Sequence, residues 1–227
     1  MALVFLVRHG QASFGTSDYD RLSDQGRRQS RWLGEYFRAR GIGFKRVVAG
    51  SLKRQRDTAV EILAGMQAAS VIGEHAGLNE YQGEALYAAH TCGRNPLEHQ
   101  GADYRDYWLT MKAAMLAWTR GELPGVPETW AQFGARTRAG IDLACEGLAR
   151  DDCALVVSSG GAISRALVDI IGSPGATAVE FNLQFRNSGF VELIAAGAGA
   201  ARHLRMVAFN AIPHLDTPER RAAITFA

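Results

Sequence analysis

Three short polar segments follow apolar runs and contain side chains that could hold an anion. They are RHG at 8–10, SLKR at 51–54 and SSGG at 158–161, after ALVFLV, RVVA and CALVV. Apolar runs of this kind are typical of strands buried on both faces of a parallel sheet. Ligands bind beyond the carboxyl ends of such strands, so we expect the three segments to meet there.

The SSGG segment admits two interpretations when it is taken alone. Small residues between a strand and a helix leave backbone N–H groups open to an anion. The same residues also fit a tight strand–helix turn that binds nothing. The other two segments, which would lie at the same edge of the sheet, favour the anion.

The histidine at position 9 is the candidate nucleophile. It lies between Arg8 and Gly10, and histidine can attack phosphorus. Arginine offers a rigid fork that matches phosphoryl oxygens, and glycine lets the backbone come close. The alternative is a histidine that only forms hydrogen bonds within the scaffold.

Cations crowd the start of the helix that Ser51 would cap, namely Lys53, Arg54 and Arg56. A cation at a helix N-terminus opposes the helix dipole by roughly 0.3–1 kcal/mol. An anion in front of the helix would offset this cost. We interpret Arg54 as a phosphate ligand, and Lys53 and Arg56 as side chains that extend into solvent.

Strands and helices must alternate to position these residues. Helical patterns run from Ser23 to near Gly41, over 51–66, over 129–148, and from 160 to Gly172. This alternation predicts an α/β fold with a mostly parallel central sheet flanked by helices. The segments 189–197 and 202–210 predict a C-terminal antiparallel strand pair.

Residues 81–127 break this alternation, with many aromatic residues and an amphipathic pattern near 102–119. We predict one domain over 1–227 in which 81–127 form a helical, lid-like insertion over the active site. The aromatic residues would either face an apolar leaving group or, as we favour, form a core of their own.

Composition excludes several classes of partner. The net charge of +2 is too small to indicate nucleic acid, and the apolar runs are too short for a membrane span. The apolar start MALVFLV is too short for a signal peptide. The cysteines, Cys92, Cys145 and Cys153, lack metal-ligand spacing. We expect a cytoplasmic protein that needs no metal or other cofactor; its oligomeric state is not predicted.

Six segments together resemble the motifs of the histidine phosphatase superfamily, the phosphoglycerate mutase-like proteins, over nearly the whole chain. LVRHGQAS (6–13) is similar to the superfamily signature, and LSDQGRRQSRWLG (22–34) to its first helix. The others are GSLKRQRDTA (50–59), GLNEYQGE (77–84) and VVSSGGAISRAL (156–167). NAIPHL (210–215) is similar to the C-terminal signature.

The resemblance implies a two-step phosphoryl transfer on a small phosphorylated substrate. His9 would attack phosphorus, while Arg8 and Arg54 neutralise the phosphoryl oxygens. Glu80 would give its proton to the leaving oxygen and then activate a water molecule. The alternative for Glu80 is an ordinary surface carboxylate.

One position departs from the superfamily pattern. Ser159 stands where a second histidine normally binds the phosphoryl group, beside Gly160 in the expected phosphate cradle. Losing one transition-state donor costs about 10²–10³ in rate. We therefore expect a phosphomonoester phosphatase that acts through a phosphohistidine and is slowed by Ser159. Since Gly160 and Gly161 are small, Ser159→His should find room and raise the rate.

Two other functions stay open. The same cradle could hold a phosphate ester without turnover, as a binding protein. A phosphoglycerate mutase is less favoured, because the chain is short where mutases of the family carry longer loops. Gly15 also stands where the mutase motif usually has asparagine.

Overall fold

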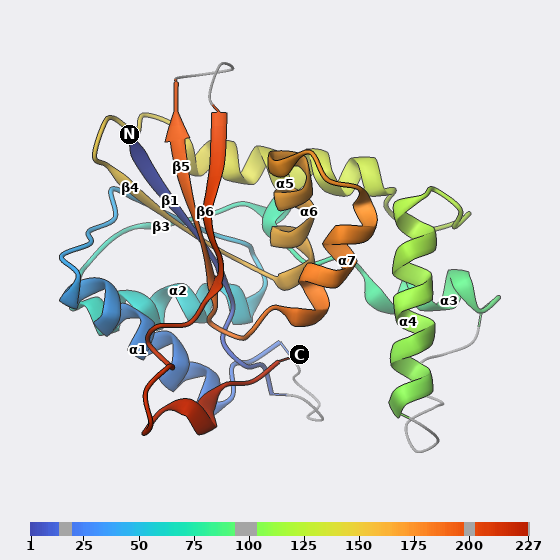
Figure 1. Cartoon of the computed structure of the whole chain (residues 1–227), viewed down its shortest axis with the longest axis horizontal. Coiled ribbons are helices and arrows are strands. Elements are labelled where there is room, and N and C mark those ends of the chain that lie inside the picture. The colour runs from blue at the N-terminus through green and yellow to red at the C-terminus, as the bar shows by residue number, and fades with distance from the viewer. Residues whose placement is uncertain (14–19, 94–103, 198–202, 227) are drawn as a thin grey trace.

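The fold is known from a computed structural model, which describes residues 1–13, 20–93, 104–197 and 203–226 (Figure 1). The strands are β1 (Ala2–Arg8), β2 (Arg46–Ala49), β3 (Ile72–Glu74), β4 (Cys153–Ser158), β5 (Phe190–Ala196) and β6 (His203–Ala211). The α-helices are α1 (Asp24–Ala39), α2 (Lys53–Met66), α3 (Gly83–His90), α4 (Tyr104–Thr119), α5 (Trp130–Cys145), α6 (Gly160–Ile171) and α7 (Gly175–Gln184). Short 3-10 turns η1 (Ala76–Leu78) and η4 (Arg221–Ala223) complete the set.

The strands form one sheet in the order β3-β2-β4-β1-β5-β6. The first four run parallel, β5 is antiparallel to β1, and β6 is antiparallel to β5. Arg8 pairs with Ser158, and Ala49 pairs with Val157, so β1, β4 and β2 end at one edge. The predicted sheet, its C-terminal antiparallel pair and the meeting of the three strand ends are therefore confirmed.

Both faces of the sheet are covered by helices, as a buried parallel sheet requires. Alternate residues of β1 point to opposite sides: Phe5 and Val7 pack with α1 and α2, whereas Val4 and Leu6 pack with α5 and α6. Figure 1 shows α1 and α2 on one side of the sheet and α5, α6 and α7 on the other. No helix in the described ranges is long and apolar enough to cross a membrane.

Helix α1 begins where the sequence predicts, and glycines let it approach its neighbours. The Ser23 hydroxyl accepts a hydrogen bond from the Gly26 N–H at 3.0 Å, which caps the helix. A Cβ on Gly26 would lie 2.1 Å from the Gln11 carbonyl oxygen, and one on Gly10 would lie 2.4 Å from the Gly26 oxygen. Helix α1 therefore supports the loop that follows β1.

The predicted cap of α2 is wrong. The helix starts at Lys53 after Leu52, and the Ser51 side chain does not cap it. Instead, the Asp20 carboxylate accepts a hydrogen bond from the Lys53 N–H at 2.8 Å. A carboxylate from a distant segment thus supplies the negative group that this N-terminus needs.

Other boundaries differ in smaller ways. Helix α5 ends at Cys145, short of the predicted residue 148, and α6 ends at Ile171 with the predicted Gly172 as its C-cap, at positive φ. Elements β3, α3 and α7 were not predicted. These are short or weakly amphipathic, and their positions depend on tertiary packing.

The aromatic insertion has a core of its own. Tyr87 and Trp118 are buried with Met115 of α4 and Phe133 of α5. Figure 1 places α3 and α4 at the end of the molecule away from α1. The favoured interpretation of these aromatic residues as core is confirmed for Tyr87 and Trp118. A lid-like role for 81–127 stays a prediction, and residues 94–103 lie outside the described part.

The C-terminal NAIPHL motif is linked through Ser188 to the backbone of His9. His214 is buried, and its Nε2 lies 2.8 Å from the Ser188 hydroxyl. The Ser188 N–H donates to the His9 carbonyl oxygen at 3.3 Å. Burial, assisted by the Arg220 charge, lowers the pKa of His214 from 6.5 to about 3.

This shifted pKa predicts a pH-dependent stability. Between pH 6.5 and 3 the unfolded chain binds a proton at His214 that the folded chain does not. The free energy of unfolding therefore decreases as the pH is lowered from 6.5 to 3. His214 contributes at most about 1.4 kcal/mol per pH unit. Urea titrations between pH 6.5 and 4.5 should show a shallower pH slope for His214→Gln. His203→Gln, at an exposed position, is the control, and equal slopes in all three proteins would contradict the prediction.

Candidate active site

The His9 ring is held in one tautomer at the end of β1. Its Nδ1 lies 2.8 Å from the Gly10 carbonyl oxygen, which can only accept, so Nδ1 carries the proton. The Nε2 atom then carries the lone pair, which accepts a hydrogen bond from Arg54 Nε–H at 3.1 Å. The nitrogen with the lone pair thus faces the cation at the start of α2.

Two arginines flank this ring, and both are buried. The Arg54 guanidinium also forms an ion pair with Asp20, Nη1 to Oδ1 at 2.7 Å. Arg8 donates from Nη1 to the carbonyl oxygen of Phe185, which closes α7. Burial, followed by the charges of Arg54 and Arg8, lowers the pKa of His9 well below 6.5. The ring is therefore neutral at neutral pH, as a nucleophile must be.

Glu80 lies at the N-terminus of α6. Its Oε2 accepts a hydrogen bond from the Gly161 N–H at 3.0 Å, and its Oε1 accepts one from the Tyr81 N–H at 3.2 Å. Loss of hydration raises the pKa of Glu80, and this outweighs the opposing hydrogen bonds and the charges of Arg54 and Arg8. The carboxyl group is biased toward the protonated form that a general acid needs.

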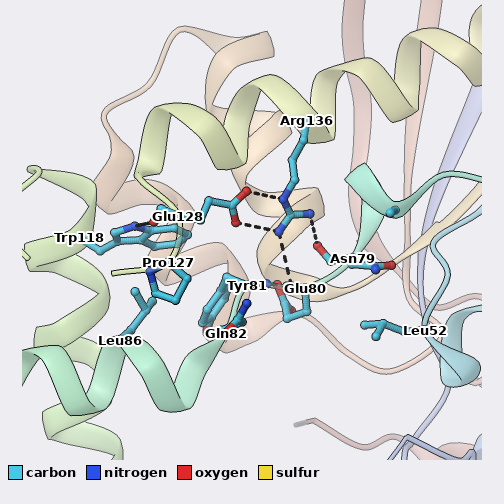
Figure 2. Close-up of a pocket in the computed structure, with 11 residues that line it drawn as sticks. Leu52, Asn79, Glu80, Tyr81, Gln82, Leu86, Trp118, Pro127, Glu128 and Arg136 are labelled. Carbon is cyan, nitrogen blue, oxygen red and sulfur yellow. Dashed lines mark hydrogen bonds and ion pairs between the residues drawn. The ribbon is translucent and has the colours of Figure 1, made fainter. Parts of the chain in front are cut away.

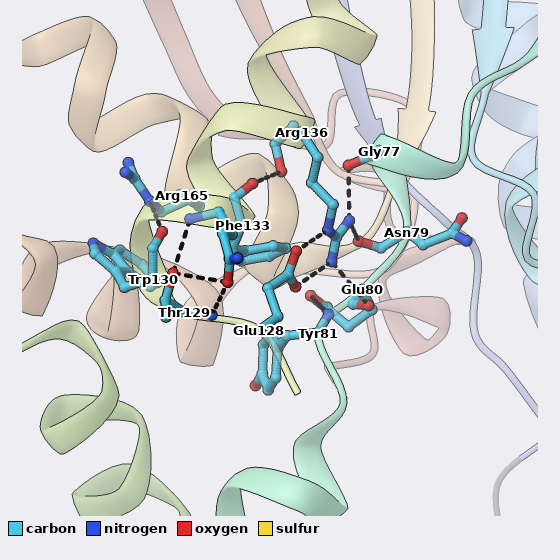
Figure 3. Close-up of polar contacts among 12 residues, drawn as sticks. Gly77, Asn79, Glu80, Tyr81, Glu128, Thr129, Trp130, Phe133, Arg136 and Arg165 are labelled. Carbon is cyan, nitrogen blue, oxygen red and sulfur yellow. Dashed lines mark hydrogen bonds and ion pairs between the residues drawn. The ribbon is translucent and has the colours of Figure 1, made fainter. Parts of the chain in front are cut away.

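Arg136 of α5 fixes the loop that carries Glu80 (Figure 3). Its Nη1 donates to the carbonyl oxygens of Gly77 and Asn79 at 2.8 and 2.7 Å. Its Nε and Nη2 pair with the Glu128 carboxylate at 2.5 and 2.9 Å. Because the guanidinium N–H groups already donate to the loop carbonyls and to Glu128, Arg136 orients the loop and has no donor left for a ligand.

The small residues after β4 are tightly enclosed. A Cβ on Gly160 would lie 2.6 Å from Asn182 Oδ1, and one on Gly161 would lie 2.4 Å from Glu80 Oε1. The space beside both glycines is therefore filled, and the gain expected from a larger ring at Ser159 stays a prediction. Ser159 is fully buried, and its hydroxyl accepts a hydrogen bond from Gln55 Nε2 at 2.8 Å.

A pocket of about 470 Å³ opens beside Glu80 (Figure 2). Aromatic and apolar side chains form one wall, and the Arg136–Glu128 pair forms another. The lining residues include Leu52, Glu80, Tyr81, Leu86, Trp118, Pro127, Glu128 and Arg136. Leu52 precedes α2, so the pocket reaches the segment that carries Arg54.

The structure brings His9 and Arg54 into direct contact and places Arg8 beside them. Glu80, Ser159 and Gly160 lie around the same strand ends. Asp20, Gln55 and Arg136 were missed from the sequence. A signal existed for Gln55 alone, since its spacing to Ala59 places it on the buried face of α2.

The described residues offer no obvious metal centre. Within 1–13, 20–93, 104–197 and 203–226, no three His, Cys, Asp or Glu residues cluster as metal ligands would. The positive charge near His9 comes instead from the two arginines. Such a constellation can neutralise a phosphoryl group without a cation of its own.

Comparison with known proteins identifies the family. Residues 4–206 match the family model of the histidine phosphatase superfamily (branch 1). No curated protein sequence matches the chain. Among solved structures, a phosphoserine phosphatase from Entamoeba histolytica, in complex with phosphoserine, has 18% identity and a TM-score of 0.66, over 95% of this chain and 100% of that one.

A mycobacterial glucosyl-3-phosphoglycerate phosphatase, solved with inorganic phosphate, has 21% identity and a TM-score of 0.66. It matches over 94% of this chain and 99% of its own. A protein from Bacillus stearothermophilus has 14% identity and a TM-score of 0.67, over 94% and 99%. At these identities the solved structures show a shared fold. Because the family model matches residues 4–206, most of this chain, the chain belongs to the histidine phosphatase superfamily, branch 1.

Proposed function

We propose that the protein hydrolyses phosphomonoesters through a phosphohistidine at His9. The observation that carries this is the pairing of opposite pKa shifts in one site. His9 has a lowered pKa and a directed Nε2 lone pair, while Glu80 has a raised pKa. A neutral nucleophile and a protonated acid are the two forms that the first step needs.

In the first step, Nε2 forms a bond to phosphorus, and the bond from phosphorus to the leaving oxygen breaks. Arg8 and Arg54 stabilise the charge on the phosphoryl oxygens. Glu80 transfers its proton to the leaving oxygen, so that a neutral alcohol departs. The pair of buried arginines makes a metal ion unnecessary in this scheme.

The second step reverses the roles. The Glu80 carboxylate takes a proton from a water molecule, whose oxygen attacks phosphorus. The bond from phosphorus to Nε2 then breaks, and inorganic phosphate leaves. His9 is again neutral, and Glu80 is again protonated, so the cycle closes without a further reactant.

A second candidate function is a phosphate-ester-binding protein. Ser159, which replaces the usual histidine, favours it, since a neutral hydroxyl is a weaker donor than a charged ring. The shifted pKa values of His9 and Glu80 favour turnover, because a site that only binds needs neither. A mutase is the least supported of the three.

The pocket beside Glu80 suggests the leaving group. Glu80 must reach the leaving oxygen, so the rest of that group would occupy the pocket that Glu80 lines. Among the described lining residues the single cation is Arg136, and its donors are spent on Glu128 and backbone oxygens. We propose a flat or apolar leaving group without a carboxylate.

The covalent step is testable by trapping. Incubation with a phosphorus-labelled aryl phosphate, followed by an alkaline quench, should leave acid-labile phosphate on His9, because a phosphorus–nitrogen bond survives alkali. His9→Ala should lose both label and turnover. His90→Ala, at an exposed histidine, is the matched control. Turnover without label, or with label on Ser159, would overturn the mechanism.

Glu80→Gln should separate proton transfer from positioning. We expect kcat for alkyl phosphates to fall by about 10²–10⁴ and to fall less for p-nitrophenyl phosphate, whose leaving oxygen needs no proton. The pKa of Glu80 is raised, so wild-type activity should decline as pH rises through it, and the variant should lack this limb. Glu84→Gln, on an exposed side chain, is the control. An equal loss for both substrates would refute the role.

The leaving-group proposal is tested with phenyl phosphate and 4-carboxyphenyl phosphate, which differ by one carboxylate. We expect kcat/KM to be about tenfold lower for the charged substrate, because its carboxylate would lose hydration without gaining a partner. Steady-state kinetics at fixed ionic strength measure the ratio. A higher kcat/KM for the carboxylated substrate would show that the pocket does supply a cation.

A further inference from the structure

Ser159 stands at the N-cap of α6 but does not cap it. A serine there usually accepts a hydrogen bond from the second or third helical N–H group. Here the Ser159 side chain makes no such bond. The Gly161 N–H is satisfied instead by Glu80 Oε2. The Ser159 hydroxyl is thus not used to cap the helix, as a serine at this position normally is.

The hydroxyl is held by Gln55 from α2. Both side chains are fully buried, and Gln55 Nε2 donates to Ser159 Oγ at 2.8 Å. The same Nε2 donates to the Leu78 carbonyl oxygen at 3.0 Å. An amide nitrogen carries two protons and accepts none, so both are committed. The Ser159 proton therefore cannot be accepted by Gln55 Nε2.

This arrangement leaves the Ser159 proton to be donated elsewhere. Among the described residues no acceptor for it is recorded, whereas its neighbour Ser158 donates to Leu78 O at 2.6 Å. Gly160, the next residue, lies close to Arg8, since a Cβ there would be 3.5 Å from Arg8 Nε, and Arg8 is joined to His9 and pairs with Ser158. A phosphoryl group bound to His9 would be an acceptor in this region.

We propose that Gln55 is a positioning residue that turns the Ser159 hydroxyl into a donor to the phosphoryl group. Gln55 and Ser159 together would then do what a single ring does elsewhere in the superfamily. This inference rests on the proposed phosphatase function. It differs from a purely structural role of Gln55, which would act through Leu78 and the loop that carries Glu80.

The Gln55 side chain also fills the space that a larger residue at 159 would need. A Cβ on Gly50 would lie 1.9 Å from Gln55 Oε1, so the amide also packs closely against the Gly50 backbone. Ser159→His alone should therefore be no faster than wild type. Ser159→His combined with Gln55→Ala should be faster than Ser159→His, because shortening Gln55 makes the room.

A double-mutant cycle tests the coupling. Gln55→Met keeps the length of the side chain and removes the donor, and Ser159→Ala removes the hydroxyl. We expect each to lower kcat about tenfold, because each would lose the one neutral hydrogen bond from Ser159 Oγ to the phosphoryl group. Orthovanadate, a trigonal bipyramidal mimic of the transferring group, should bind about tenfold more weakly, whereas KM should change little. The double variant should lose no more than either single variant.

Ser158→Ala is the matched control, since it also deletes a hydrogen bond to Leu78 O but does not touch Ser159. A positioning role predicts that Ser158→Ala retains vanadate affinity while Gln55→Met does not. Equal losses in both, or fully additive losses in the Gln55→Met and Ser159→Ala pair, would overturn the inference in favour of loop support. Circular dichroism and thermal melting show whether each variant is folded.

The inference and the proposed function can fail separately. If wild type binds vanadate and phosphate without turnover, the phosphatase proposal fails, and the same cycle is read from vanadate affinity by calorimetry. Coupled losses there would support Gln55 as a positioning residue in a binding protein. Turnover with uncoupled losses would overturn the role of Gln55 alone, and a protein that binds neither anion would overturn both.

Discussion

The hydrogen bond from His9 Nδ1 to the Gly10 carbonyl oxygen is the interaction on which the site depends. It fixes the tautomer, and so it decides which ring nitrogen carries the lone pair that the proposed attack on phosphorus would use. The carbonyl can hold this position because α1 approaches the loop at Gly26, where a side chain would collide with Gln11. Backbone contacts from Ser188 hold the His9 carbonyl from the other side.

Two effects set the pKa values in the site: the loss of hydration on burial and the charges of nearby side chains. For His9 both act together, because burial and the two arginines each disfavour the imidazolium. For Glu80 they oppose, since Arg54 and Arg8 favour the carboxylate while lost hydration favours the acid and wins. The same pair of arginines thus lowers the pKa of His9, while the net shift in the pKa of Glu80 remains upward.

Much of the fold and part of the site could be predicted from the sequence, for physical reasons. Apolar runs before RHG and SSGG predict parallel strands, and parallel strands must end at one edge, so the meeting of Arg8, Ser159 and Arg54 follows. The roles of Arg8, His9, Arg54 and Glu80 came from motifs and remain proposals. Asp20 and Arg136 act across long stretches of chain through side-chain contacts, which have no periodic signal.

The SSGG segment does hydrogen-bond a carboxyl group, and that group belongs to the protein itself. Glu80 Oε2 accepts the hydrogen bond from the Gly161 N–H. This has a consequence for the missing histidine. A charged ring at position 159 would favour the Glu80 carboxylate and lower the pKa of the acid. The neutral pair of Gln55 and Ser159 adds no such charge, so Glu80 keeps its proton more readily. In the proposed mechanism, one substitution would therefore have two results: a weaker donor to the phosphoryl group and a general acid that is more readily protonated.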